Sequence, residues 1–119
     1  MEIDNLNKYQ KVYLAYKIFN YWNSGNIIYK GKKIIPSEFN ISKIEEVLKV
    51  YLTCSKIDED KKVSEIMNYF NKLNIYEKLD FMIYLFDIVN DIEIIPNYIT
   101  NGFSLKDLSN KLIEYKLSL

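Results

Sequence analysis

The spacing of apolar residues predicts a chain made mostly of helices. Between residues 5 and 23, apolar side chains recur at steps of three and four, as they do on one face of an α-helix: Leu6, Tyr9, Val12, Tyr13, Tyr16 and Phe19. The second half of this segment also carries apolar residues on its far side, namely Leu14, Ile18, Tyr21 and Trp22. We therefore expect a helix that is either deeply buried or exposes an aromatic patch.

The same pattern predicts four later helices, over residues 42–54, from residue 58, over 76–90 and over 104–119. Ser42 and Glu45 fit a capping box at the start of the first of these, and Ser104 with Asp107 caps the last. Apolar residues surround most of the 76–90 segment, so we expect it to be a central helix packed on several sides.

Residues 24–36 interrupt the helical pattern. Ser24-Gly25-Asn26 is a stop signal, and isoleucine pairs lie on both sides of Lys30-Gly31. This arrangement predicts a short β-hairpin or an extended link over residues 26–36, although a lone two-stranded hairpin is only marginally stable without packing.

A short phrase occurs twice: Ile-Ile-Pro, a Phe, a polar residue and a helix. It covers Ile34 to Pro36 with Phe39, and again Ile94 to Pro96 with Phe103. An Ile before Pro is held out of the helical region, and each Phe suits a hydrophobic staple at the next helix start. Two interpretations stay open: an ancient duplication, or coincidence in an isoleucine-rich chain. Either way the phrase describes scaffold.

Length and composition favour one all-α domain over residues 1–119, a compact bundle of about five helices with the short hairpin or link. Hydrophobic residues make up 49% of the 119 residues and charged residues 27%, which is a globular composition. No apolar run is long enough to cross a bilayer, and the start of the chain is acidic and polar, unlike a signal peptide. We therefore expect a cytoplasmic protein without membrane contact.

Few residues suit catalysis or metal binding. The chain has no His, one Cys (Cys54) and scattered glycines, so we expect no enzyme, no catalytic residues, no metal and no cofactor. The clustered exception is a carboxylate line on the 76–90 helix and just after it: Glu77, Asp80, Asp87 and Asp91. Side chains seven residues apart on one helix lie about 10 Å apart, too far to share an ion. We interpret the line as a solvated stripe.

Nucleic-acid binding is the alternative function. Residues 42–54 and the helix from residue 58 have the spacing of a helix-turn-helix, with Lys30, Lys32 and Lys33 as a basic wing. However, the formal net charge is zero, all sixteen basic residues are Lys, and the recognition helix would begin at Asp58-Glu59-Asp60. Phosphates would be repelled by that end, so a DNA-binding regulator is the second hypothesis.

The leading hypothesis is a non-catalytic protein that binds and modulates another protein, by inhibiting or neutralising it. Aromatic residues make up 15% of the chain, and aromatic side chains are enriched at interfaces. The candidate contact residues gather near the helix break: Tyr21, Trp22, Tyr29, Lys30, Lys32 and Lys33. A competing interpretation is that Trp22 only closes the core.

The amino-acid usage suggests where such a protein comes from. Lysine without arginine, together with eighteen Ile, thirteen Asn and eleven Tyr, is typical of an AT-rich genome. A phage or plasmid product such as an immunity, antitoxin or anti-defence protein would suit this composition. A homo-oligomer formed through the far side of the 5–23 helix is a third hypothesis.

Overall fold

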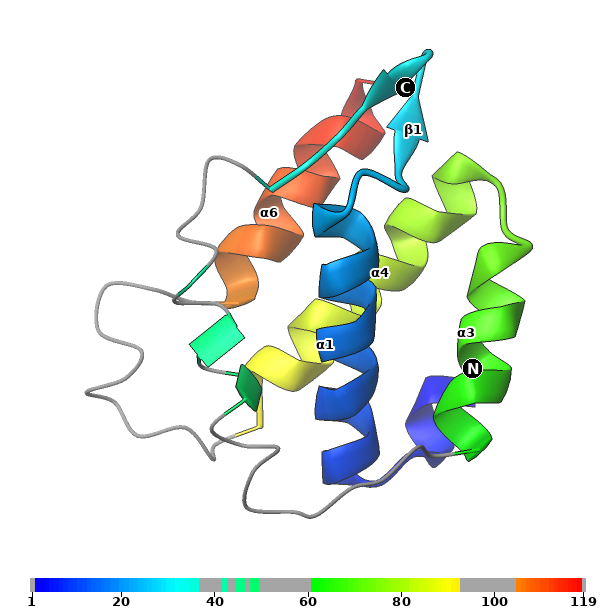
Figure 1. The fold of residues 1–119 in the computed structure, drawn as a ribbon. Coiled ribbons are helices and arrows are strands. Elements are labelled where there is room, and N and C mark those ends of the chain that lie inside the picture. The colour runs from blue at the N-terminus through cyan, green and yellow to red at the C-terminus, as the bar shows by residue number, and fades with distance from the viewer. Residues whose placement is uncertain are drawn as a thin grey trace.

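The computed structural model describes residues 2–36, 42, 45–46, 48–49, 61–92 and 105–118. Over these residues the chain is mostly helical, with four α-helices and one short two-stranded antiparallel sheet, which confirms the predicted fold class. In chain order the elements are η1 (Glu2–Asn5), α1 (Lys8–Asn23), β1 (Ile28–Tyr29), β2 (Lys32–Lys33), α3 (Lys61–Asn71), α4 (Ile75–Asn90) and α6 (Leu105–Leu117) (Figure 1). None of the helices described is long and apolar enough to cross a membrane.

Two helices begin with capping boxes built on asparagine. The Asn7 side chain accepts a hydrogen bond from the Gln10 backbone N–H at 2.9 Å, and the Gln10 side chain accepts one from the Asn7 N–H at 2.8 Å. Asn74 and Glu77 repeat this exchange at the start of α4, at 2.9 and 3.3 Å. These reciprocal bonds satisfy N–H groups that the first helical turn leaves without partners. The sequence signal of these two helix starts is Asn-x-x-Gln or Asn-x-x-Glu.

Helix α1 ends in a Schellman motif, as the predicted stop signal suggested. The Asn26 N–H donates to the Tyr21 carbonyl at 3.4 Å, and the Gly25 N–H donates to the Trp22 carbonyl at 3.1 Å. Gly25 has a φ of 82°, a left-handed conformation that glycine adopts without a Cβ clash. This motif turns the chain away from the helix and into the hairpin.

The β-hairpin is small and depends on its neighbours. Its register pairs Ile28 with Lys33 and Tyr29 with Lys32. The turn residues Lys30 and Gly31 have φ values of 50° and 77°, the two positive values of a type I′ turn. The next pair along is joined by the Ile34 N–H, which donates to the Ile27 carbonyl at 2.9 Å. Ile27 and Ile34 are both buried, and their packing supports a sheet too short to be stable alone.

Helices α4 and α6 form an antiparallel pair. Asp80 near the start of α4 pairs with Lys116 near the end of α6, and Asp87 near the end of α4 pairs with Lys106 near the start of α6. Between these ion pairs, the buried Ser109 hydroxyl donates to the Ile83 carbonyl at 3.4 Å. A small residue at this point lets the two helices approach closely.

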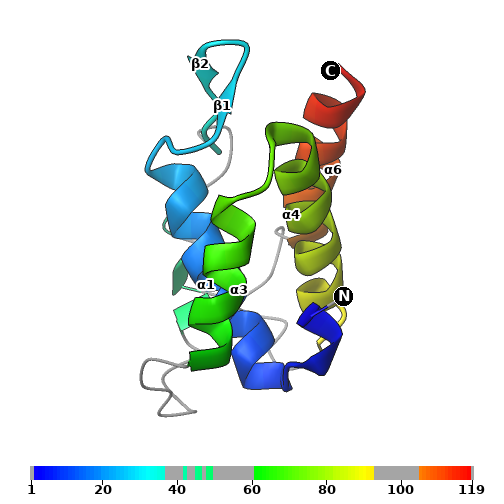
Figure 2. The same ribbon diagram turned by 90° about the vertical axis from the view of Figure 1, so that its right-hand side faces the viewer.

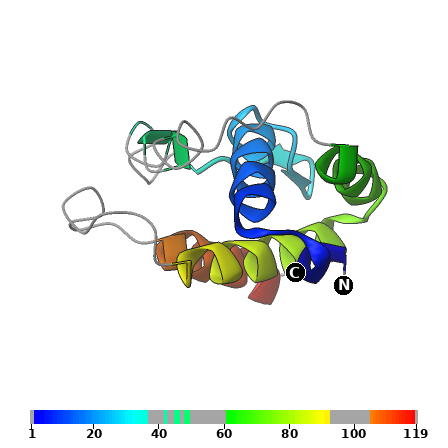
Figure 3. The same ribbon diagram turned by 90° about the horizontal axis from the view of Figure 1, so that it is seen from below.

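The core lies between the α4–α6 pair and a second layer formed by α1 and α3 (Figures 2 and 3). Helix α1 contacts both α3 and α4. Its buried residues come from more than one side of the helix: Val12, Leu14, Ala15, Ile18, Phe19 and Trp22. Helix α1 therefore buries side chains on more than one side, while Tyr9 is 44% exposed and Tyr13 and Tyr16 are half-buried. Helix α4 buries six side chains and has the central position that was predicted.

Some predictions fall on residues that the structure does not describe. Residues 42, 45–46 and 48–49 are helical, in agreement with the predicted helix over 42–54, but its remaining residues and the acidic segment 58–60 lie outside the described ranges. The same holds for Phe39 and for the second copy of the repeated phrase, from Ile94 through Phe103. Duplication and coincidence therefore both stay open.

Candidate functional site

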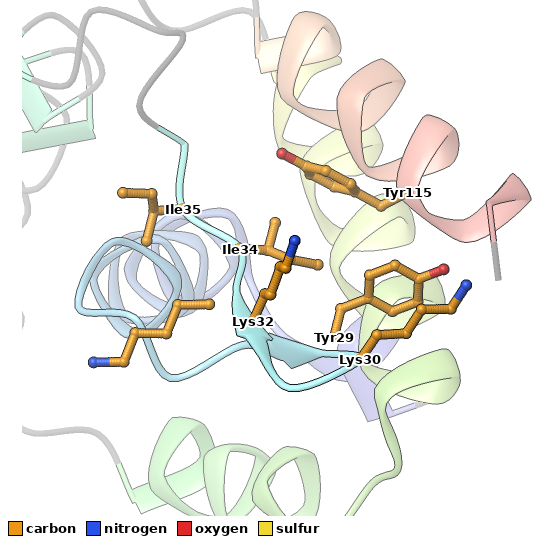
Figure 4. A pocket seen from close by; sticks show the side chains of 7 residues that line it. Tyr29, Lys30, Lys32, Ile34, Ile35 and Tyr115 are labelled. Atoms are coloured by element: carbon orange, nitrogen blue, oxygen red, sulfur yellow. The ribbon is translucent and has the colours of Figure 1, made fainter.

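A groove runs between the β-hairpin and the C-terminal end of α6. It has a volume of about 510 Å³ and is lined by Tyr29, Lys30, Lys32, Lys33, Ile34, Ile35 and Tyr115 (Figure 4). We call it the hairpin groove. Four of the six residues predicted to contact a partner lie along it, and all four come from the hairpin.

Tyr29 fixes the hairpin to α6. Its hydroxyl donates to the carbonyl of Ser118 at 2.5 Å, across 89 residues of sequence. Its ring is half-buried and lies beside Lys30, whose Nζ is 5.2 Å from the ring centroid. A cation at this distance from an aromatic face is weakly attracted to it. The Tyr29 ring therefore forms a wall of the groove, and its hydroxyl holds the hairpin against the end of α6.

The charge of the groove is positive. Among the described residues that line it, three are lysines and none is acidic. All three lysines are exposed, but the stem of Lys33 lies against Gly25, where an added Cβ would come within 3.0 Å of Lys33 Cδ. In Figure 4 the Lys32 side chain extends toward Tyr115, and Lys30 lies beside Tyr29. Lys30 and Lys32 are therefore the cations best placed to meet an anionic ligand.

The opposite wall of the groove is apolar. Ile34 is buried and Ile35 is 42% exposed, and the Tyr115 ring faces them from α6 (Figure 4). Lys111 Nζ lies 5.3 Å from the centroid of the Tyr115 ring and 3.2 Å from a carboxylate oxygen of Glu114. Tyr115 was not predicted as a site residue, because its spacing in the sequence marked it only as part of the apolar seam of the last helix.

Trp22 and Tyr21 do not belong to the groove. Trp22 is fully buried, with ring centroids of Phe19 and Phe86 each 6.4 Å away, and its Nε1 has no hydrogen-bond partner among the described residues. The structure therefore supports the interpretation that Trp22 closes the core. Tyr21 is half-buried against Phe70, and its hydroxyl accepts a hydrogen bond from Lys78 Nζ at 3.3 Å.

The carboxylate line on α4 is occupied by structural contacts. Asp87 pairs with Lys106 at 2.8 Å, Asp80 pairs with Lys116, and Glu77 completes the capping box of α4. Asp91 is the C-cap residue of the same helix. Within the described ranges, no group of three or more His, Cys, Asp and Glu side chains could hold a metal ion. The interpretation of the line as a surface stripe is retained, with two of its members binding α6.

The helix-turn-helix alternative depends on residues that the structure mostly leaves undescribed. The predicted turn at 55–57 and the acidic start of the recognition helix at 58–60 lie outside the described ranges. The described parts are the body of the predicted recognition helix, α3, some residues of the preceding helix, and the basic wing of Lys30, Lys32 and Lys33, which lines the hairpin groove.

Comparison with known proteins does not extend the argument. No model of a protein family matches this chain, and no curated protein and no solved structure matches it. The residues of the groove themselves are therefore the basis for a candidate function.

Proposed function

We propose that this protein is a non-catalytic binding protein that contacts and modulates another protein through the hairpin groove. The observation that carries the proposal is the meeting of three lysines and two tyrosines in one groove whose described lining has no acidic residue. Tyrosine joins apolar contact area with a polar tip, and a local excess of cations favours an oppositely charged partner.

The chemistry of the lining favours binding over catalysis. Ammonium and phenol groups both act as hydrogen-bond donors, and the described lining has no His or carboxylate to accept a proton from a substrate. The groove also rests on a scaffold that holds its shape, because Tyr29 is bound to Ser118 and Ile27 and Ile34 are buried. A preorganised surface loses less entropy when a partner docks.

Modulation by docking is the mode of action we favour. A small helical protein whose contact surface is a hairpin would inhibit or neutralise its target by covering a functional surface. The amino-acid usage of an AT-rich genome supports a phage or plasmid origin, where such small inhibitors act against larger proteins.

Capture of the partner from a lysate of the native host tests the proposal. The protein is used beside the double variant Lys30→Glu/Lys32→Glu and a matched control, Lys61→Glu/Lys72→Glu, which makes the same charge change at exposed lysines of α3 and the turn after it. We expect one captured protein to be lost with the groove variant and retained with the control. A partner that both variants retain, or both lose, would contradict the assignment of the groove.

The rival ligand of the same lysines is nucleic acid. Phosphate contacts release counterions, so binding of DNA or RNA would weaken steeply as salt rises. A gel shift at two salt concentrations separates the hypotheses. A retarded band that disappears at the higher salt concentration, and is absent for Lys30→Glu/Lys32→Glu, would favour the DNA-binding regulator instead.

A further inference from the structure

Among the described residues the hairpin sheet has two strands, β1 and β2, and the outer edge of β2 is its most relevant feature. Each strand pairs with one neighbour, so within the part of the chain that the structure describes one side of β1 and one side of β2 have no strand beside them. Unpaired backbone groups along such an edge can pair with another extended chain. The edge of β2 matters most, because Lys32, Lys33, Ile34 and Ile35 all line the hairpin groove.

The alternation of hydrogen-bonded and non-bonded pairs along the hairpin shows which backbone groups point outward. In an antiparallel pair, opposite residues alternate between bonded and non-bonded pairs. The Tyr29–Lys32 pair closes the two-residue turn, and the Ile34 N–H donates inward to Ile27 at 2.9 Å. Lys33 lies between these positions, so its N–H and C=O point to the outer edge. Ile35 is the next residue whose backbone groups point to the same edge as those of Lys33.

The side chains on this edge select what can pair with it. Lys32 and Lys33 make up the whole of β2, and Lys30 precedes it in the turn. Lysine on an edge strand disfavours pairing with a second copy, because like charges would then face each other across the new strand pair. A strand that carries carboxylates would meet complementary charge instead. The same three lysines therefore reject one class of partner and favour another.

The groove also offers a place for apolar side chains. Side chains alternate between the two faces of an added strand, so acidic and apolar residues at alternate positions would face different surroundings. Ile34, Ile35 and Tyr115 line the apolar wall, while Lys30 and Lys32 supply the charge. An amphipathic acidic strand matches both features.

We infer that the hairpin groove binds an extended acidic segment of the partner protein, added as a third strand along the outer edge of β2. This inference rests on the proposed function and names the chemistry of its ligand. In this mode backbone hydrogen bonds supply affinity and the alternate side chains supply specificity. The Lys33 N–H and C=O are the groups that would pair with the added strand.

A synthetic peptide of alternating Glu and Val, acetylated and amidated at its ends, is the probe. Its binding to the whole protein is followed by the backbone amide signals of ¹⁵N-labelled protein as the peptide is added. We expect the Lys33 amide to shift and to exchange more slowly with solvent. The Lys30→Glu/Lys32→Glu variant should weaken binding at least about fivefold, since two cations of the site are reversed, whereas Lys61→Glu/Lys72→Glu should not. The same peptide with Lys in place of Glu should not bind.

Two N-methylated versions of the probe test the backbone pairing directly. In one, the nitrogens of the Glu residues are methylated, and in the other those of the Val residues. Because alternate N–H groups of a strand point to opposite edges, one version should keep its affinity and the other should lose it. Equal affinity of the two versions, or no binding of the parent peptide at millimolar concentration, would overturn the inference.

The outcomes separate this inference from the proposed function. If the lysate partner depends on Lys30 and Lys32 but neither the peptide nor its Lys33 signature is seen, the groove is the site and strand addition is wrong. If partner capture ignores the groove variant, the proposed function fails as well. Tighter binding of single-stranded DNA than of the peptide, with the Lys33 amide unchanged, would also overturn the strand-addition mode in favour of phosphate binding.

Discussion

Helix α6 takes part in two polar surfaces that differ in whether their lysines are paired with carboxylates. Along α4, its Lys106 and Lys116 meet Asp87 and Asp80, so each cation has a carboxylate beside it. At the other surface, the end of α6 faces a hairpin whose three lysines line a groove without an acidic residue in its described lining. The first arrangement is that of a structural interface, and the second is the surface that we propose binds an anionic partner.

The two surfaces also differ in burial: the α4–α6 interface is more buried than the hairpin groove. At the α4–α6 interface, Ser109 and Leu112 are fully buried. In the hairpin groove, Ile35 is 42% exposed, the lysines are exposed and Tyr115 is only half-buried. A charge that is paired at a packed interface contributes to the fold, whereas an exposed cation beside apolar surface is available for binding. The comparison predicts that substitutions at the first surface change stability and those at the second change affinity.

The largest expected effect comes from the packed side of α6. Leu112→Ala should lower the free energy of unfolding by about 2–5 kcal/mol, because it removes buried methyl groups and leaves a cavity. The matched control is Leu117→Ala, the same change on the same helix at a residue that is 82% exposed, and it should alter stability by less than about 0.5 kcal/mol. Urea unfolding of the three proteins measures both values. Similar losses for the two variants would remove the contrast between the two surfaces.

A substitution in the turn of the hairpin should give the second-largest loss of stability. Gly31→Ala places a Cβ at a φ of 77°, which costs about 1–2 kcal/mol even though the space around the residue is open. The cost should appear as faster hydrogen exchange of the Ile34 N–H, which donates to Ile27. Lys30→Asn is the matched change, since asparagine tolerates a left-handed φ and leaves the turn intact. Fast exchange in Lys30→Asn would mean that the lysine itself supports the turn.

The ion pair between Asp87 and Lys106 should contribute a smaller free energy to stability than the two features above. A double-mutant cycle with Asp87→Asn and Lys106→Met should yield a coupling of about 0.2–1 kcal/mol, because both side chains are part exposed. A parallel cycle of Asp87→Asn with Lys72→Met, whose residues belong to different surfaces, serves as the control and should give no coupling. Equal coupling in the two cycles would show that the effect is general electrostatics and not this contact.

The smallest effect should appear at high pH. The hydrogen bond that Tyr84 donates to Asp4 at 2.5 Å raises the pKa of Tyr84, and the bond with Asp80 raises the pKa of Lys116. A group whose folded pKa lies above its unfolded value contributes stability that is complete below the unfolded value, near 10.0 for Tyr84. That contribution is lost as pH rises through the folded pKa. The midpoint temperature of thermal unfolding should therefore fall more steeply from pH 8 to 11 for the natural protein than for Tyr84→Phe.

The Lys116→Met variant extends the alkaline experiment to the α4–α6 interface. Its stability should also depend less on pH than that of the natural protein in the same range, because the favourable charge of Lys116 is lost there. Parallel curves for all three proteins would show that neither contact stabilises the fold.

The helices and the hairpin could be predicted because their signals are local. Apolar spacing located α1, α4 and α6, and Lys30-Gly31 between isoleucine pairs located the turn. The helix starts were less accurate, because Asn7 and Asn74 were not used as caps. Of the predicted contact residues, those of the hairpin share the groove because they are neighbours in the chain.

The remaining parts of the site depend on contacts between distant residues. The sequence placed Trp22 beside Tyr29 as an equal candidate, yet Trp22 faces Phe19 and Phe86 in the core. Tyr115 reaches the groove from α6, and Ser118 receives the Tyr29 hydroxyl across 89 residues. The carboxylates of α4 looked alike in the sequence, and only the position of α6 showed that Asp80 and Asp87 are paired.

By itself the sequence determined which segments are helical, which faces are apolar and where the chain turns, because propensity and periodicity act over a few residues. Only the tertiary structure decided which of the many lysines and aromatic residues are paired, buried or left facing a groove. The physical reason is that burial and charge neutralisation are properties of surfaces brought together from distant parts of the chain, and in this protein the docking of α6 creates both the packed interface and the lysine-lined groove.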